Sequence, residues 1–527
     1  MYIVEDKKSI LLKLHEPEKV LNVIPTASSI CSLTDGTTLV KVPHHLEETK
    51  VLNNLNIAVP SPIVHYYKWP SSKKPYAHQK STSAFLTLNP RGVVLNDIGT
   101  GKTLSSLWAL DYLMSIGVIR NALVISPLST LERVWGDAMF TGFSHLIYSV
   151  LSGTSLTRKR QLHILTDRVK VVNFDGFVSL YNDIISLSKV YAIDCLIVDE
   201  AAFLRNPSTK RFKLIYNFVK RVNPPYIWLL TGTPTPNEPT DAWSLVKMIR
   251  GGGFTTTYSA FREQVMMKVS MFRWIPRKDA ATTVKTLLTP SIRYTRDECL
   301  DLPETVVQTR QADLTPVQSA AYKLMLKHFV AEVSNNTITA VNEAVKMQKL
   351  VQIVCGVIYN SDGESVEIDC GPRIKLVEEI IEESGEKVII FVPLTGVLKM
   401  LEEKISKRWT IACVWGATTP TKRNQIFKDF QTQPNPHVLI AHPGTMSHGL
   451  TLTEASTIIW YGPVTSNDQY TQACGRIERI GKKSVSNVIH IESSPIERAM
   501  YERLQSKQTL QGLLLNLIAN RKDEYVV

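Results

Sequence analysis

Residues 95–103, with the sequence LNDIGTGKT, combine two glycines with a lysine and a threonine in a pattern that can bind phosphate. Gly99 and Gly101 lack a Cβ, so the backbone there can approach an anion closely. A buried strand is expected before the stretch and a helix after it, which directs a helix N-terminus and backbone N–H groups at one point. Lys102 can then reach the β- and γ-phosphates of a nucleotide, and the Thr103 hydroxyl can bind Mg²⁺. The alternative is an ordinary strand-to-helix turn with a solvated lysine.

A second candidate is the acidic pair in CLIVDEAAF, residues 195–203. Both carboxylates follow an apolar run that predicts a buried strand, and ligands of open α/β sheets bind at the carboxyl ends of the strands. Asp199 is suited to hold Mg²⁺ through water, and Glu200 to polarise the water that attacks a γ-phosphate. The pair follows Lys102 by about a hundred residues, which is the order found in nucleotide hydrolases. An acidic pair at an ordinary strand end remains the alternative.

The stretch LTGTPTPNEPTDAWSLVKMI, residues 230–249, begins where the next predicted strand ends. If that strand lies beside the one before Asp199, the Thr231 and Thr233 hydroxyls come close to the carboxylate and could sense a terminal phosphate. The glycine and prolines of this stretch also suit an ordinary turn.

Two arginines lie near the end of the chain in QACGRIERIGKK, residues 472–483. If this stretch is helical, Arg476 and Arg479 are three residues apart and share one face. An arginine can stabilise the charge that develops on a γ-phosphoryl group, because its planar fork grips phosphate oxygens in pairs. The alternative is a basic helix on the surface.

The elements that must position these residues form two regions. Continuous Val/Ile/Leu runs alternate with helical stretches in both, which predicts parallel sheets covered on both faces and therefore two α/β domains. The runs lie at 92–95, 122–126, 170–174, 195–200 and 227–232 in the first region, and at 387–392, 410–414, 437–441, 457–462 and 487–492 in the second.

The remaining segments of the chain lie outside the two predicted α/β domains. Residues 315–355 have a helical pattern, and residues 356–373 suggest a small hairpin that leads into a linker. Residues 251–261 suggest a loop or hinge, and residues 1–70 suggest a small α/β or β-rich domain without a recognisable motif. No repeat of solenoid period is present.

Length, composition and net charge limit the kinds of protein to which this chain can belong. The chain has 527 residues, 44% of them hydrophobic, and a formal charge of +12 from 60 Lys+Arg and 48 Asp+Glu. Such a length and composition predict a soluble protein of several domains, and the positive charge suits a polyanionic partner such as nucleic acid. No apolar run has the length of a membrane span, the N-terminus does not have the pattern of a signal peptide, and seven scattered cysteines suggest a reducing compartment.

In order and spacing these stretches resemble the helicase motifs of superfamily two, specifically its Swi/Snf-type DNA translocase branch. The resemblance spans roughly residues 70 to 505, and compact versions of this architecture occur in bacteriophages. The segments that carry it are 75–86 (PYAHQKSTSAFL), 95–103, 122–139 (ALVISPLSTLERVWGDAM), 195–203, 230–246, 294–322, 414–431 (VWGATTPTKRNQIFKDFQ) and 447–483.

The resemblance implies a fold of two RecA-like parallel-sheet lobes with a helical linker and a small N-terminal domain. The expected boundaries are 1–70 for the N-terminal domain, 71–290 for the first lobe, 291–372 for the bridge and helical linker, and 373–527 for the second lobe. It also implies ATP and Mg²⁺ as cofactors, with Thr103 and Asp199 at the metal. The implied catalytic residues are Lys102, Glu200, Arg476 and Arg479, and the implied nucleotide-binding residues are Gln79 (at the adenine), Gly99, Thr100, Gly101, Lys102, Thr103, Asp199 and Gly449.

Two positions depart from the family pattern. Ala202 stands where the acidic motif usually ends in His or Asp, which removes one possible contact to residues 230–246. Asn96 stands where the phosphate loop usually begins with an acidic or small residue. Neither change removes a group that does chemistry.

Three functions remain open at this point. The first is an ATP-dependent translocase on duplex or branched DNA that remodels it or displaces bound proteins. The second is a strand-separating helicase on DNA or RNA, and the third is a nucleotide-gated DNA clamp with little turnover. Retention of Lys102, Glu200 and Arg479 argues against the clamp, because a clamp does not need an attacking water.

The expected partner is DNA, contacted mostly through its backbone. We expect no membrane association, a monomer, and a place in the cytoplasm at the nucleoid, or in a host cytoplasm if the gene belongs to a phage. A wedge for strand separation could come from residues 1–70 or from the aromatic and basic residues 64–74. The candidate DNA contacts are 126–130, 173–176, 393–396 and 442–449, all at predicted strand ends.

Overall fold

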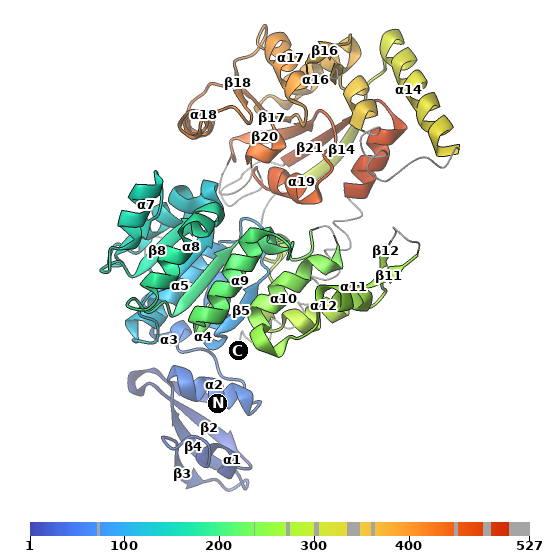
Figure 1. The fold of residues 1–527 in the computed structure, drawn as a ribbon. Coiled ribbons are helices and arrows are strands. Elements are labelled where there is room, and N and C mark those ends of the chain that lie inside the picture. The colour runs from blue at the N-terminus through green and yellow to red at the C-terminus, as the bar shows by residue number, and fades with distance from the viewer. Residues whose placement is uncertain are drawn as a thin grey trace. The chain divides into compact units, whose positions relative to one another are not determined.

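Two parallel sheets dominate the computed structural model of the chain (Figure 1). The chain divides into two compact units, one made of the described residues up to Cys299 and the other of those from Thr305 to Leu504. The fold class expected from the sequence, two parallel-sheet lobes with a small N-terminal domain, is confirmed. The structure describes residues 1–70, 74–236, 238–269, 274–299, 305–334, 348–359, 364–446, 452–477 and 486–504.

The first unit is built around a seven-stranded sheet whose order is β13-β5-β10-β9-β6-β8-β7. All of its neighbouring strands pair in parallel. The five strands expected in this region are present with ends shifted by at most two residues, and two short edge strands, β7 and β13, were not expected. The strands are β5 (Arg91–Val94), β6 (Ala122–Ser126), β7 (Tyr148–Val150), β8 (Val169–Asn173), β9 (Cys195–Asp199), β10 (Tyr226–Leu230) and β13 (Ser291–Ile292).

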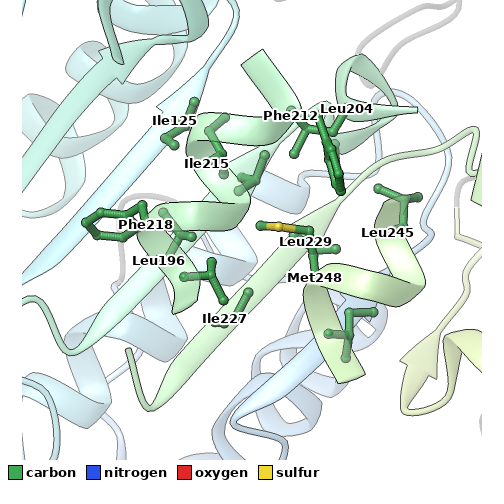
Figure 2. Close-up of a cluster of buried hydrophobic side chains, with 14 of the residues drawn as sticks. Ile125, Leu196, Leu204, Phe212, Ile215, Phe218, Ile227, Leu229, Leu245 and Met248 are labelled. Carbon is green, nitrogen blue, oxygen red and sulfur yellow. The ribbon is translucent and has the colours of Figure 1, made fainter. Parts of the chain in front are cut away.

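Helices cover both faces of this sheet, which explains why its strands are apolar throughout rather than alternating. Along β10, Ile227 and Leu229 face one hydrophobic cluster, and Trp228 and Leu230 face another. Figure 2 shows the first cluster, in which side chains of α9 and α10 pack against β9 and β10. The main helices of the unit are α4 (Ala77–Leu88), α5 (Lys102–Ser115), α6 (Asp137–Gly142), α7 (Ser155–Leu162), α8 (Phe174–Leu187), α9 (Lys210–Val222), α10 (Ala242–Arg250), α11 (Tyr258–Val265) and α12 (Ala280–Leu288).

Two smaller sheets belong to the first unit as well. The N-terminal residues form a four-stranded antiparallel sheet with its own apolar core, in agreement with the β-rich expectation. A two-stranded antiparallel hairpin lies between α11 and α12. The elements are β1 (Tyr2–Val4), β2 (Ser9–Leu14), α1 (Glu18–Leu21), β3 (Ser28–Ser32), β4 (Thr38–Pro43), α2 (Leu46–Asn54), α3 (Ile63–Tyr66), β11 (Met266–Lys268) and β12 (Trp274–Pro276).

The second unit contains a six-stranded sheet of order β14-β21-β20-β17-β19-β18, again entirely parallel. Its edge strand β14 was not expected, whereas the small hairpin expected within 356–373 is present as β15 and β16. The elements are β14 (Thr305–Gln311), α14 (Pro316–Ser334), β15 (Val357–Tyr359), β16 (Ser365–Glu367), α16 (Gly371–Ser384), β17 (Lys387–Phe391), α17 (Thr395–Ile405), β18 (Ile411–Val414), α18 (Pro420–Thr432), β19 (Val438–Ala441), β20 (Ala455–Trp460), α19 (Asn467–Cys474) and β21 (Ser486–Glu492). No described helix of either unit combines the length and apolarity needed to cross a bilayer.

Candidate nucleotide site

The glycine-rich stretch connects β5 to α5, so the strand, loop and helix expected around it are present. Gly99 and Gly101 both have left-handed backbones, with φ of 87° and 85°. A Cβ on Gly101 would lie 2.2 Å from Nε2 of Gln79, which leaves no room for a side chain. Glycine is therefore needed at position 101 for both its backbone conformation and its lack of bulk.

Lys102 is the first residue of α5, and its side chain is buried. Its Nζ donates hydrogen bonds to the backbone oxygens of Asn96, at 2.9 Å, and Asp97, at 3.1 Å. Burial lowers the pKa of this ammonium group, while the carboxylates of Glu200 and Asp199 act in the opposite direction. An ammonium has three N–H donors, so a buried lysine held by two carbonyl groups retains the capacity to bind an anion.

The strand register brings three segments to the same edge of the sheet. Leu230, the last residue of β10, pairs with Val94 on one side and with Asp199 on the other. The backbone N–H of Thr231 donates to the oxygen of Val94 at 2.9 Å. A Cβ on Gly232 would lie 3.3 Å from the backbone oxygen of Asn96, so this glycine packs directly against the phosphate loop.

The arrangement supports the sequence-based prediction that the strands before Asp199 and Thr231 are neighbours. Thr231 and Thr233 are both buried, and the backbone N–H of Thr233 donates to the Thr231 hydroxyl at 3.2 Å. The Thr-Gly-Thr stretch therefore lies between the phosphate loop and the acidic pair. A change in the conformation of either can be transmitted to it.

The indole of Trp135 orients Asp199, the first residue of the acidic pair. The sequence did not suggest this contact. Nε1 of Trp135 donates to Oδ2 of Asp199 at 2.9 Å, and the backbone N–H of Glu200 donates to Oδ1 at 3.0 Å. Hydrogen bonds of this kind stabilise the ionised form of a carboxylate. Glu200 has a left-handed backbone with φ of 49°, which is uncommon for a residue with a side chain and is a recurrent feature of functional sites.

Gln79 lies on α4 and contacts the phosphate loop from the side. Its Nε2 donates to the backbone oxygen of Thr100 at 3.1 Å, and its Oε1 accepts from the backbone N–H of Tyr76 at 3.1 Å. Nε2 of His78 also lies 2.9 Å from the Thr100 oxygen. Thr103, in the first turn of α5, has a half-buried side chain. Gln79 therefore links the start of α4 to the phosphate loop, and its role in reading adenine stays a prediction.

Asn96, which departs from the family pattern, has a definite structural role. Its Nδ2 donates to the Thr82 hydroxyl at 2.9 Å, and its Oδ1 accepts from the backbone N–H of Tyr294 at 3.0 Å. Both side-chain groups of this buried amide are thereby paired, as buried polar groups generally are. Asn96 ties the loop to α4 and to the segment that follows β13.

Asp97 binds the same segment through its carboxylate. Its Oδ1 forms an ion pair with Nη2 of Arg293 at 2.6 Å, and its Oδ2 accepts from the backbone N–H of Arg296 at 3.0 Å. Arg293 is almost completely buried. Sequence reasoning missed this arginine, although an acidic residue inside a phosphate loop was a signal that a cation had to lie nearby.

The second unit holds the remaining predicted site residues. Arg476 is buried, but α19 ends at Cys474, so Arg476 lies in the turn after the helix rather than on a helical face. The backbone oxygen of Arg476 accepts from the N–H of Leu452 at 3.0 Å. Arg479 and Gly449 lie outside the described residues.

Comparison with known proteins places these features in a family. Residues 41–356 match the SNF2-related domain, and residues 372–481 match the helicase conserved C-terminal domain. The chain belongs to the SNF2-related family. It is accordingly an ATP hydrolase with a helicase-like ATPase core, and the resemblance identified from the sequence is confirmed.

Individual relatives are distant. The chain is 25% identical over 461 residues to putative protein p41 of Acyrthosiphon pisum secondary endosymbiont phage 1, covering 82% of this chain and 95% of that protein. It is 24% identical to the nuclear protein STH1/NPS1 of Saccharomyces cerevisiae, covering 80% of this chain but only 33% of the yeast protein. Among solved structures, the SWI2/SNF2 ATPase core of Sulfolobus solfataricus in complex with double-stranded DNA is similar at 22% identity, with a TM-score of 0.40, covering 86% of this chain and 96% of that chain.

Proposed function

We propose that this protein is an ATP-driven motor that moves on duplex or branched DNA and remodels it or displaces bound proteins. One observation carries the proposal: the phosphate loop, the acidic pair and the Thr-Gly-Thr stretch meet at one edge of the first sheet, in a chain of the SNF2-related family. Relatives of known name include a mouse chromodomain-helicase-DNA-binding protein 1-like that is 25% identical over 450 residues. The positive charge of the chain also suits DNA.

In this proposal, different residues of the chain bind the phosphates, activate the water and read the adenine. Lys102 moves from its carbonyl partners to the β- and γ-phosphates of ATP, and the backbone of Gly99, Thr100 and Gly101 surrounds them. Glu200 accepts the proton of the attacking water. Gln79 reads the adenine.

The donor set at this edge fits Mg²⁺. Mg²⁺ is usually bound in proteins by one or two carboxylates together with substrate phosphates and water. The Asp199 carboxylate, oriented by Trp135, and the Thr103 hydroxyl supply oxygen ligands of the required kind. Bound there, the ion would neutralise charge on the phosphates.

The remaining proposed roles belong to residues of the second unit. Arg476 and Arg479 would stabilise the charge that develops on the γ-phosphoryl group, and Gly449 would contact the nucleotide. An arginine in that role is worth about 10³- to 10⁵-fold in rate.

Contacts to DNA are proposed for four segments at the carboxyl ends of strands. Residues 126–130 and 173–176 begin at the last residues of β6 and β8, and residues 393–396 and 442–449 follow β17 and β19. Residues 447–449 are not described. Backbone N–H groups and small side chains at such positions bind phosphates without reading sequence.

The test compares steady-state ATPase rates with duplex DNA, single-stranded DNA, RNA and no nucleic acid, at one salt concentration. We expect duplex DNA to stimulate turnover most strongly, and the Lys102→Ala variant to show no turnover in any arm. Stimulation by RNA alone would reject the DNA motor. Absence of stimulation by every nucleic acid would favour the nucleotide-gated clamp.

A further inference from the structure

Helix α9 has an exposed side that is almost entirely cationic. Each exposed residue of the helix lies three or four positions from another, so these residues share one side of it. None of them is acidic or apolar. They are Lys210, Lys213, Asn217, Lys220 and Arg221, and we call them the basic face of α9.

The opposite side of α9 is fixed in the core of the first unit. Phe212, Ile215 and Phe218 are buried in the hydrophobic cluster that α9 shares with α8 and α10 (Figure 2). Figure 1 shows α9 beside these two helices on one side of the first sheet. The basic face is therefore held toward solvent and cannot turn inward.

The charges of the basic face are not balanced by their surroundings. Helix α9 carries five cationic residues and α10 carries two, and neither helix carries an acidic one. Lys247 and Arg250 of α10 donate to backbone oxygens of the same unit. Within the described residues, Arg211 is the one cation of α9 that forms an ion pair, with Asp175 at 2.8 Å. A surface that serves solubility alone usually mixes charges of both signs.

The position of two of these cations weakens the helix. Lys210 and Lys213 lie at the start of α9, where its first turn has no acidic residue. A helix is positive at its N-terminus and like charges three residues apart repel, so both lysines oppose the formation of α9. Lys220 and Arg221, in the last turn, agree with the macrodipole. Helix stability therefore does not account for the cations at the start, whereas an anionic ligand does.

The basic face begins beside a segment for which a DNA contact is already proposed. The ion pair between Arg211 and Asp175 joins the start of α9 to residues 173–176. From Lys210 to Lys220 the helix rises about 15 Å, which corresponds to about four successive phosphates of one DNA strand. The basic face can therefore continue the proposed contact along the helix.

We infer that the basic face of α9 binds the phosphate backbone of duplex DNA, as a contact surface of the first unit beyond the ends of its strands. Lysine, arginine and asparagine side chains are common donors to DNA phosphates. An acidic protein fits less well, because protein interfaces are depleted in lysine and have an apolar centre that α9 does not expose. The inference rests on the proposed function, which it deepens by assigning a further DNA contact.

The experiment measures binding of the full-length protein to a blunt DNA duplex and to poly-L-glutamate, each at several salt concentrations. The test variant replaces three lysines of the basic face. The control replaces three other exposed lysines of the first unit that form no ion pair within the described residues. The changes are Lys210→Gln, Lys213→Gln and Lys220→Gln in the test variant, and Lys41→Gln, Lys268→Gln and Lys278→Gln in the control.

We expect the control to bind duplex DNA as the parent does and the test variant to lose at least about tenfold in affinity. The slope of log affinity against log salt should be smaller by about 2 to 3 in the test variant, because three phosphate contacts are lost. The duplex concentration that gives half-maximal ATPase stimulation should rise by the same factor as the dissociation constant.

Three results would overturn the inference. The first is equal duplex affinity and equal salt slope in the test variant and the control. The second is a test variant that loses affinity for poly-L-glutamate but not for the duplex, because the basic face would then fit an acidic protein. The third is a Tm of the test variant well below that of the control, which would give these lysines a role in the fold.

The ATPase measurement separates this inference from the proposed function. Stimulation of the parent by duplex DNA, together with equal duplex binding by the two variants, removes this inference alone. Absence of stimulation by every nucleic acid removes the proposed function.

Discussion

The two parallel sheets use buried charge at the carboxyl ends of their strands in different ways. In the second unit, Arg373 of α16 and Glu497 form an ion pair of 2.7 Å, and their side chains are 1% and 0% exposed. Arg373 also donates to the Ser493 hydroxyl at 2.9 Å and to the backbone oxygens of Ile491 and Tyr461. The proximity of Glu497 raises the pKa of Arg373, against the effect of burial.

In the first unit, Lys102 is a buried cation that is not matched in this way. Within the described residues, Lys102 donates to the backbone carbonyl groups of Asn96 and Asp97, and burial lowers its pKa although three nearby carboxylates oppose that effect. An enclosed ion pair with its hydrogen bonds satisfied holds a fold together, whereas a buried cation without a carboxylate in contact is suited to a charged ligand. The comparison supports the proposal that Lys102 binds a charged ligand, and it indicates that the pair of Arg373 and Glu497 stabilises the second unit.

The largest effect should come from Glu200→Gln. This change keeps the shape of the side chain and removes the group proposed to accept a proton, so kcat should fall by about 10²- to 10⁴-fold. ATP binding, measured with a fluorescent nucleotide, should persist. The matched control is Glu47→Gln on the exposed side of α2, which should hydrolyse at the parent rate. A Glu200→Gln enzyme with the parent kcat would mean that another group activates the water.

Disruption of the ion pair between Arg373 and Glu497 should affect the stability of the fold instead of the chemistry. Arg373→Ala leaves Glu497 buried and unpaired, which typically costs about 3–5 kcal/mol of unfolding free energy. Replacement of both residues, as Arg373→Met with Glu497→Leu, should recover most of that loss. Denaturant unfolding of the three proteins measures the effect, and a single variant as stable as the parent would contradict the assignment.

An intermediate effect is expected where the phosphate loop meets the segment after β13. Arg293→Lys keeps the charge but loses the guanidinium group that joins Asp97 to the backbone oxygen of Tyr294, and a hydrogen bond to a charged group is worth about 1.5–3 kcal/mol. Arg293 acts here through the loop, as a positioning residue, so KM for ATP should rise about tenfold while kcat changes less. Arg211→Lys, in an exposed pair with Asp175, is the control.

A change of kcat alone in the Arg293→Lys variant would contradict the positioning role. In that case the guanidinium group would act in the chemical step rather than on the conformation of the loop.

Much of this fold could be predicted, because continuous apolar runs in a helix-strand alternation specify buried parallel strands. The missed strands lack that signal. β13 has only two residues, and β14 (TVVQTRQ) is mostly polar and exposed at the edge of its sheet. Lys102 and Asp199 could be found because each lies in a compact local pattern.

The partners that orient these residues could not be found in this way. Arg293 is 196 residues from Asp97, and Trp135 is 64 residues from Asp199, so no local spacing connects either pair. Only the sheet order, which brings β13 beside β5 and β6 beside β9, makes them neighbours. Prediction from sequence therefore reached the groups that we propose to do the chemistry and missed the residues that orient them.

The smallest effect is a dependence of the second unit's stability on pH. His490 is buried, its Nε2 is hydrogen-bonded to the Tyr470 hydroxyl at 2.8 Å, and its ring stacks on the Tyr501 ring with 4.1 Å between centroids. Burial lowers the pKa of His490 to about 4, although Glu492 opposes the shift. The unfolded chain then binds a proton near pH 6.5 that the folded chain does not, so this contribution to stability is complete above pH 6.5 and is lost as the pH falls toward 4.

Between pH 7 and pH 5.5 the unfolding free energy should fall by about 1 kcal/mol through His490. His490→Phe should remove that part of the pH dependence, with His163→Phe on the first unit as the control, and a parent and variant with the same pH profile would show that His490 does not contribute.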